Sequence, residues 1–101
     1  MRVFLSCLAL LLLYVDLAHA RDFPPSSKVG RLAGFERPYV RIESNTFQLA
    51  PAARTFDANN RLVQPSTLPI GARVVYKLEA ATGFVHTIWL LAPNEVVNIL
   101  P

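Results

Sequence analysis

The chain has 101 residues and a formal net charge of +3, which suits one small domain at most. Hydrophobic residues make up 52% of the chain, more than a disordered protein contains. One cysteine and two histidines exclude both a disulfide framework and a metal site built from several Cys and His ligands.

The first twenty residues follow the order of a secretory signal peptide. Arg2 supplies the positive start, residues 3–15 form an apolar run of about 13 residues, and Ala18-His19-Ala20 is a small-x-small cleavage site. A membrane-spanning helix needs roughly 20 apolar residues. Cleavage near Ala20 is therefore predicted, with an uncleaved anchor as the alternative. An exported domain that keeps no cysteine favours a periplasmic or secreted bacterial protein.

A flexible lead-in is predicted over residues 21–27, where Pro24 and Pro25 are followed by two serines. A single domain is expected over residues 28–101. Its first strand is predicted over residues 29–34, where glycines permit a bend or a bulge.

A hairpin is predicted next, from residues 39–43 to residues 46–49. In the first of these strands Val40 and Ile42 alternate with Tyr39 and Arg41, so the valine and isoleucine are expected to point inward. The two-residue turn is placed at Ser44-Asn45.

The middle of the chain contains proline and turn residues. A short edge strand is predicted over residues 54–57, followed by a turn over residues 58–60. Residues 64–71 form a loop, in which Leu68 and Ile70 are expected to plug the core.

The strongest pattern covers residues 73–91. Val74, Tyr76 and Leu78 share one face of a strand, a turn over residues 80–83 ends in glycine, and residues 84–91 are apolar on both faces, as in a central strand. Regular alternation divides this last strand into two expected faces. The two faces are Val85, Thr87, Trp89 and Leu91, and Phe84, His86, Ile88 and Leu90. A short helix is predicted over residues 94–100, with a strand as the alternative.

These elements predict an all-β fold, a small, partly open antiparallel barrel of five or six strands with a short C-terminal helix. Three features carry a resemblance: Gly30-Arg31-Leu32, the hairpin from Val40-Arg41-Ile42 to Phe47-Gln48-Leu49, and the spacing of Leu68, Gly71 and Val74. In this order the chain resembles the small exported OB-like β-barrel proteins of bacteria, several of them of unknown function. The resemblance covers about 60 residues and implies a fold, with no functional residue carried over.

Catalytic chemistry finds little support in these residues. His86 is the only candidate base after leader removal, and the sequence gives it no fixed partner. The acidic residues are scattered, among them Glu36, Glu43, Asp57, Glu79 and Glu95, and no cofactor or metal site is predicted. A small enzyme that uses His86 remains the least favoured alternative.

Binding is the favoured function. An apolar strand face with Trp89 suits a protein partner in the bacterial envelope. Arginines interleaved with aromatic residues suit an anionic ligand, and export argues against nucleic acid. Membrane contact is expected only through an uncleaved leader. The candidate binding residues are Trp89, Tyr39, Arg41, Arg73, Lys77 and His86.

Overall fold

The computed structural model describes residues 21–99, so the predicted leader over residues 1–20 lies outside the described residues. Within this range there is no helix with the length and hydropathy needed to span a membrane. The elements are β1 Asp22–Phe23, β2 Lys28–Glu36, β3 Tyr39–Ile42, β4 Asn45–Phe56, the 3₁₀ turn η1 Pro65–Thr67, β5 Arg73–Leu78, β6 Val85–Leu90 and β7 Asn98–Ile99.

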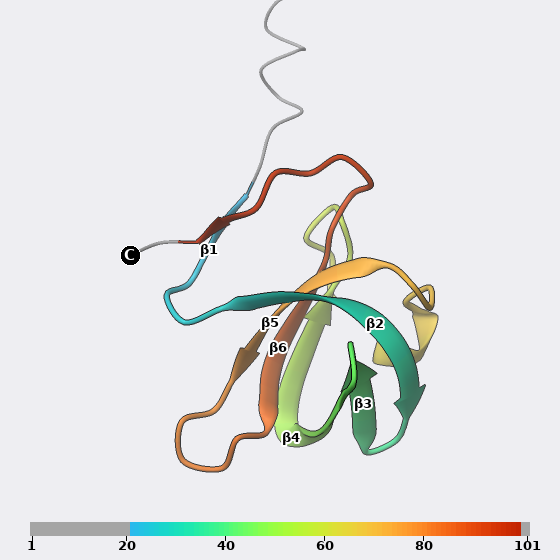
Figure 1. Ribbon diagram of the computed structural model, residues 1–101, viewed down its shortest axis with the longest axis vertical. Helices are drawn as coiled ribbons and strands as arrows, with labels where there is room; N and C mark the ends of the chain where they lie inside the picture. The colour runs from blue at the N-terminus through green and yellow to red at the C-terminus, as the bar shows by residue number, and fades with distance from the viewer. Residues whose placement is uncertain (1–20, 100–101) are drawn as a thin grey trace, which may run out of the picture.

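Five strands form one mixed sheet that closes in a ring, in the order β2-β3-β4-β6-β5 with β5 pairing back onto β2 (Figure 1). The neighbours β5-β2-β3-β4 have Greek-key order, since β5 returns by a long connection to lie beside β2. The all-β prediction is confirmed, but the prediction of a wholly antiparallel barrel is wrong, because β4 and β6 are parallel. A closed ring with an odd number of strands cannot alternate in direction throughout, so one pair must be parallel.

The strand β2 closes the ring because it pairs with two partners. Its first half pairs with β5 and its second half with β3, and the register with β3 shifts by one residue at Ala33. Such a bulge bends a strand and increases its twist. Gly30 is buried at the bend, where a Cβ atom would lie only 2.6 Å from Ile42 Cγ2. The absent side chain lets the two strands approach.

The strand β4 interrupts the regularity of the ring. It extends from Asn45 through Pro51 to Phe56, and its register with β6 jumps between Leu49 and Arg54. Proline has no N–H group to donate to a ladder, so the pairing breaks around it. The short strand predicted over residues 54–57 is the last part of β4: Arg54 to Phe56 pair with β6, whereas β3 pairs only with residues 45–48.

A second bulge changes the faces of β6. Lys77 is opposite Thr87, but Leu78 is opposite Val85, so His86 is the extra residue. The sequence placed Val85 with Trp89 on one face, and this is wrong: Val85 packs inside the ring with Ile88, whereas Trp89 packs outside it. Regular alternation cannot anticipate the one-residue shift that the bulge introduces.

The apolar side chains form two clusters. The larger one fills the ring and includes Val40 and Ile42, as predicted, while Phe47 and Tyr76 pack there with ring centroids 5.5 Å apart. Leu68 also joins it, but Ile70 is 64% exposed, so only half of the predicted plug is confirmed. The smaller cluster lies outside the ring around Phe23, Val75 and Leu91, with Trp89 and Val97 against it.

The two ends of the described chain meet beside this smaller cluster. β1 and β7 pair in parallel, Asp22 opposite Asn98 and Phe23 opposite Ile99 (Figure 1). The predicted C-terminal helix is therefore wrong: residues 93–94 form a turn, and Asn98–Ile99 form the strand β7. The segment assigned to a flexible lead-in, 21–27, contributes Phe23, whose side chain is 1% exposed.

Arg21 joins the ends of the described chain electrostatically, and we call its contacts the Arg21 clasp. Its Nε donates to Glu95 Oε2 at 2.9 Å, and its Nη2 donates to the Leu90 carbonyl at 2.6 Å. A further contact connects Nη1 to Asn60 Oδ1. Burial raises the pKa of Glu95, but hydrogen bonds from Arg21 and from the Ala92 N–H outweigh it, and the net pKa is lowered.

Replacing Gly30 with alanine should destabilise the fold. The new Cβ would overlap Ile42 Cγ2, an atom of a fully buried β-branched side chain. We expect Gly30→Ala to lower the free energy of unfolding by about 1–3 kcal/mol in urea denaturation. Gly34→Ala is the matched control, since its Cβ would meet nothing within 4 Å. Equal stability of the two variants would contradict the close approach of β2 to β3.

Acid should weaken the Arg21 clasp. The pKa of Glu95 in the folded protein lies below the ordinary pKa of a glutamate. The carboxylate therefore makes its full contribution to the free energy of unfolding above the ordinary pKa, and this contribution is lost as pH falls through the folded pKa. We expect Glu95→Gln to cost about 1.5–3 kcal/mol at neutral pH. In denaturation series the cost should shrink as pH falls below the ordinary pKa of a glutamate and through the lowered pKa of folded Glu95. Glu36→Gln is the control, because Glu36 is exposed and makes no salt bridge within residues 21–99. A pH-independent cost of Glu95→Gln would contradict the clasp.

Candidate functional site

The outer side of β3 carries a polar surface built by strand alternation, which we call the β3 surface. Val40 and Ile42 point into the ring, so Tyr39 and Arg41 point out, as predicted. Tyr39 is opposite Gln48 on β4 and Arg41 is opposite Thr46, which places these four side chains on one face. The full β3 surface consists of Gly34, Glu36, Arg37, Tyr39, Arg41, Thr46 and Gln48.

A shallow hollow of about 300 Å³ lies within the β3 surface. It is centred on the cross-strand pair of Gly34 and Arg41, where the glycine contributes no side chain. Glu36, Tyr39 and Thr46 contribute to its lining. Tyr39 is 49% exposed, so its ring is available to a ligand that enters the hollow.

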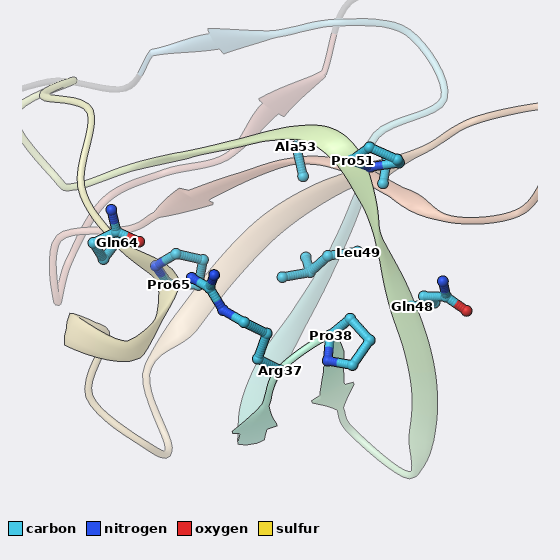
Figure 2. Close-up of a pocket in the computed structure, with 9 residues that line it drawn as sticks. Arg37, Pro38, Gln48, Leu49, Pro51, Ala53, Gln64 and Pro65 are labelled. Atoms are coloured by element: carbon cyan, nitrogen blue, oxygen red, sulfur yellow. The ribbon is translucent and has the colours of Figure 1, made fainter.

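A second hollow, of about 380 Å³, lies where β4 leaves the ladder at Pro51. Figure 2 shows Leu49 pointing into this hollow and Arg37 extending from the turn between β2 and β3 toward Pro65. Gln48 points to the other side of β4 in the same view. Arg37 therefore lies between this second hollow and the polar side chains of β3.

The cations of the β3 surface have no carboxylate partner among residues 21–99. The only salt bridge in this range joins Arg21 to Glu95, and neither Arg37 nor Arg41 has a carboxylate oxygen within 4.0 Å. An arginine has five N–H donors in a planar fork that fits carboxylate or phosphate oxygens. The surface therefore offers donors that the described protein does not itself use.

Trp89 lies in a different place from the β3 surface. It is half-buried outside the ring, in an edge-to-face contact with Phe23 at 5.4 Å and stacked near Phe56 at 6.5 Å between ring centroids. β3 and β6 are not neighbours in the ring, so Trp89 does not combine with Tyr39 or Arg41. The segment that covers it is β1.

The other predicted binding residues are also separate from Tyr39 and Arg41. Arg73 and Lys77 lie on β5, both half-buried, and His86 is the exposed bulge residue of β6. The Nδ1 atom of His86 lies 2.6 Å from Thr87 Oγ1, and no carboxylate of residues 21–99 forms an ion pair with the ring. The six predicted residues therefore do not form one site. Tyr39 and Arg41 share the outer face of β3, whereas Arg73, Lys77 and Trp89 lie on the outer face of the β5–β6 pair, where Trp89 is opposite Val75.

Sequence reasoning missed Arg37 and Gly34 as members of the surface. Arg37 lies in a turn, where alternation gives no direction, and the hollow at Gly34 depends on the one-residue shift in β2. Pro51 inside an apolar strand pattern was the available signal for the second hollow, because proline marks a break in a ladder.

The groups with shifted pKa values within residues 21–99 lie away from the β3 surface. Burial, and then the charge of Glu43, raise the pKa of the Tyr76 hydroxyl inside the ring. Backbone N–H groups of a turn, first that of Arg61, lower the pKa of Asp57, and the Arg21 clasp accounts for Glu95. No group of three or more His, Cys, Asp and Glu side chains within the described range could hold a metal ion.

Comparison with protein families, with curated proteins and with solved structures finds no match for this chain.

Replacing Phe23 with alanine should expose Trp89 and destabilise the domain. The phenylalanine ring is 1% exposed and contacts Trp89 edge-on. We expect Phe23→Ala to cost about 3–5 kcal/mol and to shift the emission of the single tryptophan to longer wavelength. Val96→Ala is the control, since Val96 is 70% exposed and its truncation should change stability by less than about 0.5 kcal/mol. Unchanged emission and stability in Phe23→Ala would contradict the packing of β1 onto the ring.

Proposed function

We propose that the protein is an exported, non-catalytic binding module of the bacterial envelope that holds an anionic oligosaccharide on its β3 surface. The observation that carries this proposal is exposed Tyr39 beside Arg41 on the outer face of β3, with Arg37 in the adjoining turn; neither arginine has a carboxylate partner within residues 21–99. A flat aromatic ring suits a sugar face. The two guanidinium groups suit the carboxylates of a polyuronate chain.

The strand order supports the placement of the ligand. A closed ring of five strands with a Greek key resembles an OB-like barrel, and such barrels bind oligonucleotides and oligosaccharides on their second and third strands. The second and third strands of this ring are β3 and β4. Nucleic acid is disfavoured for an exported protein, which leaves the saccharide.

The two hollows support an extended ligand. They lie on either side of the turn that carries Arg37, and their volumes are about 300 and 380 Å³. Gln48 and Thr46 stand opposite Tyr39 and Arg41 and offer amide and hydroxyl groups to sugar hydroxyls. A chain of several sugar rings could contact both ends of this surface at once.

Export rests on the order of residues 1–20, which is that of a secretory signal peptide. Arg21, which makes the clasp with Glu95, directly follows the predicted cleavage site at Ala20. Periplasmic or secreted location is thus part of the proposal.

A protein partner bound through Trp89 is less favoured than the saccharide. Phe23 and Val97 pack against the cluster around Trp89, so β1 already occupies the apolar face that such a partner would need. An enzyme that uses His86 is less favoured still, because the ring contacts only Thr87 among the polar groups of the described residues.

The proposed function is tested by titrating the protein with an oligomer of uronic acid. We expect Arg41→Ala and Arg37→Ala to weaken binding by roughly tenfold or more, the effect of losing a charged hydrogen-bond donor. Tyr39→Ala should weaken binding at all salt concentrations, whereas the arginine variants should also reduce its dependence on salt. Calorimetry at two salt concentrations measures both effects.

Arg61→Ala is the matched control, because Arg61 is exposed on the turn after β4, away from the β3 surface. It should bind the uronate oligomer like the wild type. Wild-type affinity in Arg37→Ala and Arg41→Ala, or no binding of the oligomer at all, would overturn the proposed function.

A further inference from the structure

A second pair of arginines lies outside the β3 surface and is not used by the proposed function. Arg31 on β2 and Arg73 on β5 are directly opposite each other in the antiparallel ladder, on the outer face of the ring. Like charges in this position repel each other, because directly opposite Cβ atoms are only about 5 Å apart. The pair therefore costs stability unless something else holds it.

The described protein does not neutralise this pair with a direct ion pair. Nη1 of Arg31 donates to the Gly71 carbonyl at 3.0 Å, and Nη1 of Arg73 donates to the Glu95 carbonyl at 3.3 Å. No carboxylate of residues 21–99 forms a salt bridge with either guanidinium. The nearest acids have other partners: Glu43 accepts the backbone N–H of Arg31, and the Glu95 carboxylate is held by Arg21. The two main-chain contacts hold the cations in place without cancelling their charge.

Both arginines line the same cavity, which has a volume of about 470 Å³. This volume is within the usual range for small-molecule sites. The remainder of the lining is apolar: Ala58, Pro69, Ala72, Leu90, Leu91, Ala92 and Pro93. The site thus joins two cations to an apolar wall.

The walls of this cavity are fixed by main-chain hydrogen bonds. Leu91 N–H donates to the Arg73 carbonyl at 3.0 Å, which holds the strand after β6 against β5. On the other side, Leu32 N–H donates to the Ala72 carbonyl at 2.9 Å and Gly71 N–H donates to the Leu32 carbonyl at 2.7 Å. A ligand would therefore meet a largely preformed site, with little ordering cost.

We infer that this cavity binds a single-chain amphiphile with an anionic carboxylate head, of the fatty-acid type. The head lies between Arg31 and Arg73 and relieves their repulsion, and the hydrocarbon chain lies against Leu90 and Pro69. A free inorganic anion would leave the apolar wall in water. A neutral hydrocarbon would leave the two guanidinium groups facing each other unpaired.

A polypeptide suits this cavity less well. Each residue of a bound peptide brings an N–H and a C=O group that need partners when they leave water. Pro69 and Pro93 in the lining have no N–H to donate. The lining therefore favours a chain without polar groups behind its charged head.

The inference is tested by titrating the purified protein with octanoate, and separately with 1-octanol and with acetate. We expect octanoate to bind at one site, at least about tenfold more tightly than either comparison compound, since only octanoate uses both parts of the cavity. Arg31→Gln and Arg73→Gln should each weaken octanoate at least about tenfold. Arg61→Gln is the matched control and should bind octanoate like the wild type.

A second set of measurements separates binding from folding. Arg31→Gln removes the like-charge repulsion, so its midpoint of urea denaturation should equal or exceed that of the wild type without ligand. Ala58→Leu narrows the cavity with no change in charge, and it should also weaken octanoate. Octanoate binding that matches acetate or 1-octanol, or that survives both arginine substitutions, would overturn the inference. The uronate titration of Arg37→Ala and Arg41→Ala is independent of these results, because neither residue lines this cavity.

Discussion

The bend of β2 is the constraint on which the rest of the architecture depends. One strand of nine residues pairs with β5 along its first half and with β3 along its second, so it must turn within its own length. Gly30 permits the close approach and the bulge at Ala33 supplies the curvature. Once β2 closes a ring of five strands, one pair has to be parallel. That pair is β4 with β6, and its ladder is interrupted around Pro51, beside the hollow that Arg37 lines.

The charged side chains of residues 21–99 pair with each other at only one place. The one salt bridge of residues 21–99 joins Arg21 to Glu95 at the meeting point of β1 and β7. Other arginines are oriented without an acidic partner. Strand alternation turns Arg41 outward, and main-chain carbonyls hold Arg31 and Arg73. Arg31 and Arg73 thus keep their positive charge unpaired, because main-chain carbonyl groups rather than carboxylates accept their hydrogen bonds.

Alternation predicted those parts of the fold where the strands are regular. The inward positions of Val40 and Ile42 followed from a period of two, and the same period placed Tyr39 and Arg41 outside. It failed at His86, where one extra residue moved Val85 into the ring. A local sequence pattern also could not predict the contacts between segments that are far apart in the chain. The burial of Phe23 follows from the pairing of β1 with β7, and the exposure of Ile70 follows from the path of a loop. The site was predictable to the same extent: Tyr39 and Arg41 on β3 were found, whereas Gly34, which depends on the shift in β2, and Arg37 in a turn were not.

The segment after β6 connects the Arg21 clasp to the cavity of Arg31 and Arg73. Arg21 donates to the Leu90 carbonyl and to the Glu95 carboxylate, while Arg73 donates to the Glu95 carbonyl. Glu95 is therefore held from two sides, through its side chain by one arginine and through its main chain by another. Residues between these contacts form one wall of the cavity. The pairing of β1 with β7 and the shape of the cavity consequently depend on the same segment, so a change that loosens the clasp acts directly on that wall.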